Sequence, residues 1–187
     1  MYNSTYTSRP LEQSKKFEIL KALPTSGPMY IPIAGNDDVF YSEGFVVRFI
    51  KANGTEWVAN FQRGDTNFSG VFELANSTNL LIVAYGSCYL MNPDVTKPLA
   101  VFGSGYVSIF KMPDGRIILQ DQIDITIVER DGEYWHSERI SWDGLKELNL
   151  NKEIISGLAY DPMRPEDAWV KFSYNIDTRK LTGGSYS

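Results

Sequence analysis

The sequence predicts an all-β fold built from about four repeated antiparallel sheets, and three observations indicate it. Aromatic residues make up 13% of the 187 residues, a content that favours strands. Runs typical of buried strands begin at Leu80, Ile117 and Ile154, a constant spacing of 37 residues. A repeat of this length indicates stacked supersecondary units. From residue 29 onward, turn residues separate short apolar or alternating segments with hardly any helical period.

The sequence predicts an N-terminal extension over residues 1–28, followed by a single repeat domain over residues 29–187. Apolar residues between Leu11 and Leu23 have the spacing of a short helix that ends before Pro24. The extension is therefore expected to be helical or irregular.

The third unit gives the clearest strand pattern. Two turn signals, Pro113-Asp114-Gly115 and Asp131-Gly132, predict tight hairpins, because Pro presets φ and Gly accepts a positive φ. Around these turns we expect four antiparallel strands, at residues 106–110, 116–120, 123–128 and 134–140. Four such strands in about 37 residues are the anatomy of one propeller blade.

Tryptophan recurs at what we interpret as one position of the unit. The residues are Trp57 in a weaker first copy, Trp135 in the third unit and Trp169 in the fourth. This recurrence predicts packing between sheets, so we expect Trp135 and Trp169 to be core residues. Truncating either to Ala should then cost about 3–5 kcal/mol.

Residues 107–119 resemble the strand, Pro-Asp-Gly, strand core of WD40-like propeller blades. The resemblance implies a propeller-like blade stack. The Gly-His and Trp-Asp signatures of that family are out of register here, and Trp142-Asp143-Gly144 begins a unit. A β-sandwich and an open barrel therefore stay as alternatives. Residues 137–144 and the 183–186 ending resemble the tails of small uncharacterised bacterial proteins, a likeness that implies no activity.

The composition limits the classes of partner and the cellular location that we expect. The net charge is −5 and no Lys/Arg cluster offsets it, so we expect no nucleic-acid partner. No apolar run approaches the length of a membrane span, and the first residues lack a signal-peptide pattern, so we expect a cytoplasmic protein without membrane contact. The single cysteine, Cys88, excludes an internal disulfide and lies in an apolar run, which predicts a buried core residue.

Chemical signatures are sparse. His136 is the sole histidine and Cys88 the sole thiol, and they lie in different units, so we expect no catalytic residue, metal site or cofactor. Asp121 and Asp124 are three apart and are expected on opposite faces of a strand. Carboxylates crowd one hairpin, but their number in this chain gives them no specificity. The crowded residues are Glu129, Asp131, Glu133 and Glu138.

One segment, residues 134–143, concentrates polar and aromatic side chains of the kind that anchor protein interfaces. The candidate binding residues are His136, Glu138, Arg139, Trp142 and Asp143. We therefore expect a non-enzymatic protein-binding module of a bacterial cytosol, such as an immunity-type inhibitor or a scaffold. The alternatives are a small carboxylate-dependent hydrolase and a carbohydrate-binding protein.

Overall fold

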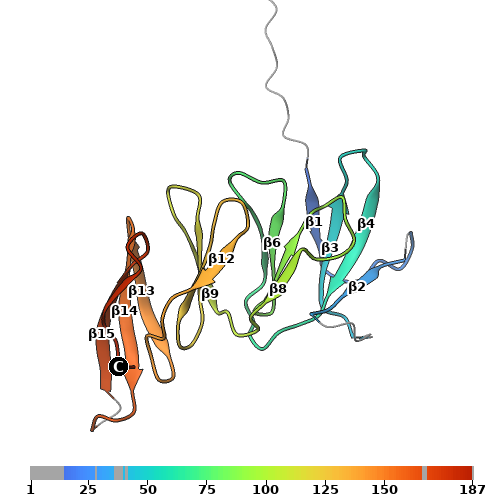
Figure 1. The fold of residues 1–187 in the computed structure, drawn as a ribbon. Coiled ribbons are helices and arrows are strands. Elements are labelled where there is room, and N and C mark those ends of the chain that lie inside the picture. The colour runs from blue at the N-terminus through green and yellow to red at the C-terminus, as the bar shows by residue number, and fades with distance from the viewer. Residues whose placement is uncertain (1–14, 28, 36–39, 41, 166–167, 187) are drawn as a thin grey trace, which may run out of the picture.

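The computed structural model describes residues 15–27, 29–35, 40, 42–165 and 168–186, and these residues form strands, turns and loops without a helix. Sixteen strands make four sheets of four strands each (Figure 1). The predicted all-β class is thereby confirmed, as is its division into four blade-like sheets. Among the described residues, no helix has the length and hydropathy to cross a membrane.

The sheets are named A to D in chain order. Sheet A contains β1 (Phe17–Leu20), β2 (Ile31–Ile33), β3 (Phe45–Ile50) and β4 (Glu56–Phe61). Sheet B contains β5 (Gly70–Glu73), β6 (Leu80–Ala84), β7 (Ser87–Met91) and β8 (Ala100–Phe102). Sheet C contains β9 (Ser108–Lys111), β10 (Ile117–Gln120), β11 (Ile125–Val128) and β12 (Tyr134–His136). Sheet D contains β13 (Leu145–Asn151), β14 (Ile154–Asp161), β15 (Ala168–Asn175) and β16 (Lys180–Gly183).

Sheets B, C and D share one topology, in which four consecutive strands pair antiparallel with their neighbours in chain order. The predicted repeat is confirmed here. Leu80, Ile117 and Ile154 begin β6, β10 and β14, the second strand of each sheet. The 37-residue period therefore measures the length of chain needed to complete one sheet and reach the same point of the next.

Sheet A departs from this topology. Its strand order is β1-β3-β4-β2, and β2 pairs parallel with β4, with Ile31 opposite Ala59. The predicted N-terminal helix is wrong over the described residues, because Phe17–Leu20 forms β1 and pairs with β3. Phe17 lies opposite Phe49, and it packs on the core through the alternation of the strand.

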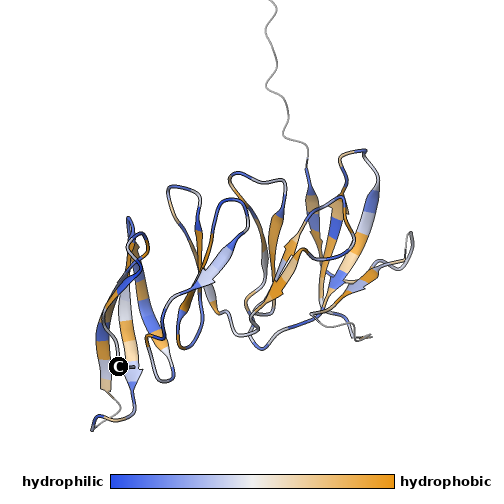
Figure 2. Cartoon of the chain, viewed as in Figure 1, coloured by the Kyte–Doolittle hydropathy of each residue, from blue (hydrophilic) through white to orange (hydrophobic). Residues whose placement is uncertain are grey.

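The sheets lie face to face in a row, and each neighbouring pair encloses one hydrophobic core (Figures 1 and 2). The position of β6 between two cores explains why its sequence is one continuous apolar run. Leu80 and Ile82 face sheet A, whereas Leu81 and Val83 face sheet C, and all four are fully buried. A strand covered on both faces needs apolar residues at every position.

The row remains open at both ends. Cores join A to B, B to C and C to D, and in the part of the chain that the structure describes none joins A to D. The sheets form neither a closed barrel nor a two-sheet sandwich. On the outward face of sheet A, Asn60 accepts a hydrogen bond from the Gly44 amide at 2.8 Å and donates one to the Ser42 carbonyl at 3.1 Å.

The predicted hairpin turns are confirmed, and they have a common geometry. In the β9–β10 turn, Gly115 has φ +93° and its amide donates to the Met112 carbonyl at 3.0 Å. The Asp114 carboxylate accepts from the Arg116 amide at 3.0 Å. Asp131 and Gly132 repeat this arrangement between β11 and β12. Each is a three-residue loop that ends in a left-handed glycine.

The prediction for Trp169 is wrong. Trp57 is buried, with 6% of its surface exposed, and Trp135 is partly buried on the C–D core. Trp169 lies opposite Tyr160 on the outward face of sheet D and is 36% exposed. The three tryptophans also occupy strands of different position, since Trp57 and Trp135 lie on β4 and β12, the fourth strands of their sheets in chain order, and Trp169 lies on β15, a third strand. Cys88, by contrast, is buried in the B–C core as predicted.

Candidate functional site

The five predicted site residues lie on β12 and on the linker to β13, where the structure divides them. His136 joins a hydrogen-bonded group inside sheet C. Arg139 and Trp142 form a separate cluster with the C-terminal segment. Glu138 and Asp143 are exposed beside these groups.

The His136 group ties together three parts of sheet C. His136 Nδ1 lies 3.0 Å from the Thr126 hydroxyl on β11. That hydroxyl lies 2.7 Å from the phenol of Tyr106, which precedes β9. Tyr106 and Thr126 are both fully buried. Because buried polar groups must pair with one another, this chain of contacts fixes β12 and the start of β9 on β11.

Asp124 adds a partly buried carboxyl group beside His136. Its Oδ1 lies 3.7 Å from His136 Nδ1, is buried, and has no hydrogen-bond partner among the described residues. Burial raises the pKa of the Asp124 carboxyl, and the negative charge of Asp121 adds to the rise, while His136 and Arg139 oppose it. Asp121 and Asp124 therefore interact, contrary to the predicted separation on opposite faces of a strand, because residues 121–124 form a loop.

Arg139 is held rigidly at the surface. Its Nε donates to the Ser141 carbonyl at 2.9 Å and its Nη2 donates to the Trp142 carbonyl at 2.8 Å. The guanidinium lies 4.4 Å from the ring centre of Tyr186 and 5.6 Å from that of Trp142. The two rings meet edge to face at 4.7 Å. We call these three residues the Arg139 cluster.

The C-terminal segment completes this cluster. The Ser185 amide donates to the Ile140 carbonyl at 2.9 Å, and the Ser185 hydroxyl accepts from the Trp142 amide at 3.2 Å. The same hydroxyl donates to the Tyr160 carbonyl. These bonds place Tyr186 against the linker, although it lies 44 residues after Trp142 in the sequence. Sequence analysis missed it, because only the return of the chain after β16 creates the contact.

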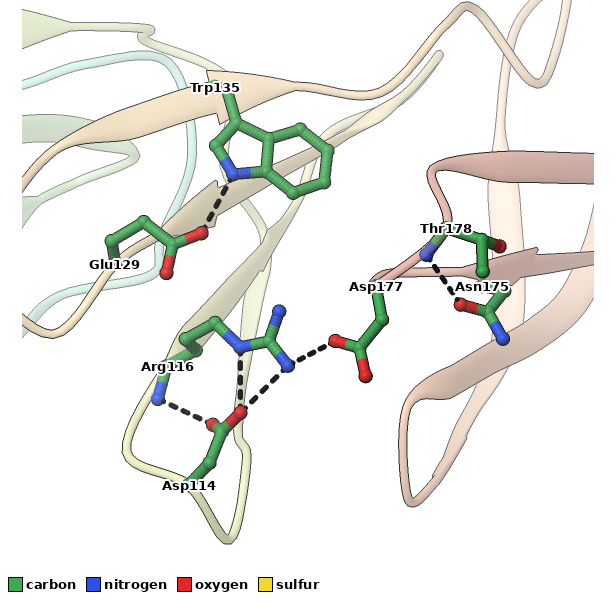
Figure 3. Close-up of polar contacts among 7 residues, drawn as sticks. All are labelled: Asp114, Arg116, Glu129, Trp135, Asn175, Asp177 and Thr178. Carbon is green, nitrogen blue, oxygen red and sulfur yellow. Dashed lines mark hydrogen bonds and ion pairs between the residues drawn. The ribbon is translucent and has the colours of Figure 1, made fainter.

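A second set of polar contacts lies between sheets C and D and includes Trp135 (Figure 3). Arg116 Nη2 lies 2.7 Å from an Asp114 oxygen and 2.5 Å from an Asp177 oxygen on the β15–β16 turn. The indole of Trp135 donates to Glu129 at 2.9 Å, and the Arg179 guanidinium lies 4.1 Å from its ring. These contacts connect neighbouring sheets, so Trp135 has a structural role.

Other chemistry finds little support in the described residues. They contain no group of three potential metal ligands. Burial raises the pKa of the Cys88 thiol, which opposes formation of the reactive thiolate. A hollow of about 280 Å³ at the A–B edge is lined by three lysines and one carboxylate, Asp94. It therefore lacks the pair of carboxylates that a glycoside hydrolase of the usual kind requires.

Comparison with known proteins returns no match: no family matches the chain, and neither the curated proteins nor the solved structures include a significant relative. The likeness to propeller blades therefore stands on the four-stranded sheets and their stacking alone.

Proposed function

We propose that this protein is a non-enzymatic recognition module that binds another protein through the Arg139 cluster. The observation that carries the proposal is the combination of exposure and rigidity in one place. Trp142 is 38% exposed and Tyr186 is 40% exposed, and the arginine between them is fixed by two hydrogen bonds. Arginine, tryptophan and tyrosine are the residue types that dominate binding energy at protein interfaces.

Rigidity supports the proposal because association costs conformational entropy. A free arginine side chain loses rotamer freedom when it is immobilised, at about 0.5–1.5 kcal/mol. Arg139 is already held against two carbonyls and two rings before any partner arrives. A surface that is already ordered in this way binds with less reorganisation. An immunity-type inhibitor or a scaffold in a bacterial cytosol is the specific form we propose, and that part rests on the sequence alone.

The first step of the test identifies the partner. A photo-crosslinking amino acid placed at Asp143, which is exposed beside Trp142, should capture one protein in stoichiometric yield from the native cell. The same group placed at Thr178, an exposed turn residue of sheet D, serves as the matched control. A protein captured from both positions would not count as the partner.

The second step measures affinity for that partner by calorimetry. Arg139→Ala and Trp142→Ala should each weaken binding by at least about tenfold, mostly through faster dissociation. Lys97→Ala, at an exposed position in a sheet B loop, should leave the affinity unchanged. The proposal fails if both cluster variants bind like the wild type while retaining its circular dichroism spectrum and melting temperature.

A further inference from the structure

In the part of the chain that the structure describes, the outward face of sheet D carries three lysines in its strand rows. In the register of the sheet, Lys146 lies opposite Leu158, and Leu158 lies opposite Lys171. Lys180 lies on the same face, opposite Asn175. The alternate residues, including Ile155, Phe172 and Tyr174, face sheet C.

No carboxylate lies in these outward rows. Besides the three lysines, the rows hold neutral residues: Asn149, Asn151, Ile154, Ser156, Leu158, Tyr160, Trp169, Ser173, Asn175 and Thr182. The whole chain has a net charge of −5, so a face of +3 leaves −8 for the remainder. Three carboxylates directly adjoin these rows in sequence: Glu147 is exposed at the irregularity within β13, Glu153 lies in the β13–β14 turn, and Asp161 is buried at the end of β14. The outward strand rows of sheet D therefore present three lysines and no carboxylate, on a protein whose net charge is −5.

Aromatic side chains adjoin the lysines. Trp169 lies opposite Tyr160, with ring centres 5.4 Å apart, and Lys146 Nζ lies 4.0 Å from the Trp169 ring centre. A Cβ added to Gly144 would meet the Trp169 ring at 3.2 Å, so the glycine leaves room for the indole. We call Lys146, Tyr160, Trp169 and Lys171 the outer D patch.

The polar residues on the outward face of sheet D argue against a partner surface that is wholly apolar. Ser156 and Ser173 occupy the row beside Leu158, where β6 in the middle of the molecule has leucine and isoleucine. A fifth sheet packed on sheet D would bury these hydroxyls, which costs free energy unless each hydroxyl forms a hydrogen bond. Contacts to this face must come mainly from charged and polar groups, with Leu158 and Trp169 supplying the apolar part.

From these observations we infer that the outer D patch binds an acidic segment of another protein, one that places carboxylates on Lys146 and Lys171 and an apolar side chain over Leu158. Across two strand spacings, the two lysine Cα atoms lie roughly 10 Å apart. Carboxylates two to four residues apart on an extended segment, about 7–14 Å, can reach both ammonium groups. The outer D patch shares no residue with the Arg139 cluster, although Ser185 bonds the Tyr160 carbonyl, and the Lys146 and Lys171 variants test the patch without altering that cluster.

Two other occupants fit less well. A second copy related by two-fold symmetry would bring the lysines of one patch against those of the other, since such an interface uses the same surface twice. A single-stranded nucleic acid would need free ring faces for base stacking. Lys146 covers one side of Trp169 and Tyr160 lies close to the same ring, so this platform is occupied.

The experiment uses a fluorescein-labelled peptide of repeated Glu-Leu-Glu-Ser units and measures its anisotropy with the full-length protein. We expect binding with a dissociation constant below about 1 mM that weakens as salt screens the charges. A peptide of repeated Lys-Leu-Lys-Ser units and an oligothymidylate should bind more weakly. Analytical ultracentrifugation should show a monomer at the same concentrations.

Matched double variants separate the patch from general electrostatics. Lys146→Glu/Lys171→Glu should weaken binding of the acidic peptide at least about tenfold. Lys21→Glu/Lys97→Glu changes the net charge equally at exposed positions of the A and B region and should retain most of the affinity. Lys146→Gln/Lys171→Gln, which adds no repulsion, should give an intermediate loss. Melting temperatures confirm that each variant is folded.

Several outcomes would overturn the inference. They are absent binding of the acidic peptide at about 1 mM, equal losses in the two charge-reversal variants, tighter binding of oligothymidylate, and a dimer that Trp169→Ala dissociates. The last two would assign the face to nucleic acid or to self-association instead.

Discussion

Asp124 is a carboxyl group whose surroundings penalise its charge. Its Oδ1 is buried without a hydrogen-bond donor among the described residues, and the one nearby base, His136 Nδ1, is 3.7 Å away. Burial raises the pKa of this carboxyl above its ordinary value, as does Asp121. The surroundings of Asp124 therefore favour the protonated acid over the carboxylate.

Because the folded-state pKa of Asp124 is raised, the folded state retains this proton at pH values where the unfolded state has lost it. The stability that Asp124 contributes should therefore fall as pH rises from about 4 through the raised value. Relative to Asp124→Asn, the wild type should lose free energy of unfolding over that window. Urea denaturation at a series of pH values measures the difference. A wild type that gains stability against Asp124→Asn with rising pH would contradict the assignment.

Residue types alone predicted some environments and failed for others. Cys88 was predicted to be buried because small apolar runs surround it, and it is. Trp169 was predicted to be buried because tryptophan recurs along the chain, and it faces outward. On a strand, a shift of one position exchanges the two faces of the sheet. Only the register against Tyr160 places Trp169 outside.

Three hairpins, with Gly54, Gly115 and Gly132 at the end of the loop, use the same turn. Comparing Gly54 with Gly115 distinguishes the backbone strain of the turn from the contact between neighbouring sheets. Gly115 and Gly54 have similar φ angles, +93° and +81°. A Cβ on Gly115 would lie 2.5 Å from the Ala75 Cβ of the sheet B region, whereas nothing lies within 4 Å of a Cβ on Gly54. The two positions thus differ in their neighbours and share their backbone requirement.

Gly54→Ala should lower the free energy of unfolding by about 1–2 kcal/mol, the cost of a left-handed residue with a Cβ. Gly115→Ala should cost about 2–4 kcal/mol, because overpacking against Ala75 adds to the same strain. Urea unfolding followed by tryptophan fluorescence gives both values. Equal losses in the two variants would show that the B–C contact at Ala75 adjusts freely.

At the level of elements, local patterns predicted sheets B to D well, because each closes with short hairpins whose turn residues are visible in the sequence. Sheet A was not predictable in this way. β2 enters the sheet parallel to β4, and β1 pairs across an intervening loop with β3, so no hairpin signal marks either strand. The Arg139 cluster likewise has a part that the sequence predicted and a part that it did not. The Trp142 neighbourhood is local, whereas Tyr186 arrives through the fold.

The whole molecule is a row of sheets in which each core joins only two neighbours. Stability in such an arrangement approaches a sum of the sheets and of the interfaces between neighbours. Sheets B and C are covered on both faces, and sheet D is covered on one. The burial of the individual strands shows the difference. Every residue of β6 is buried, whereas β14 is buried at Ile155, Ala159 and Asp161 and is exposed or partly buried at its other positions.

Sheet D should therefore open without the rest of the molecule, and a matched pair of substitutions tests this. Ile155 in the C–D core and Ile82 in the A–B core are both fully buried, and replacing either by Ala should cost about 2–5 kcal/mol at its own interface. Ile155→Ala should speed hydrogen exchange of β14 and β15 amides while β6 amides keep their protection, because sheet D is held by one core alone. Ile82→Ala should speed exchange in β6 and in sheet A, its partner across that core. Mass spectrometry of the exchanged peptides resolves these strands. If Ile155→Ala accelerated β6 and β14 equally, the four sheets would unfold as one cooperative unit, and the additive description of the row would be wrong.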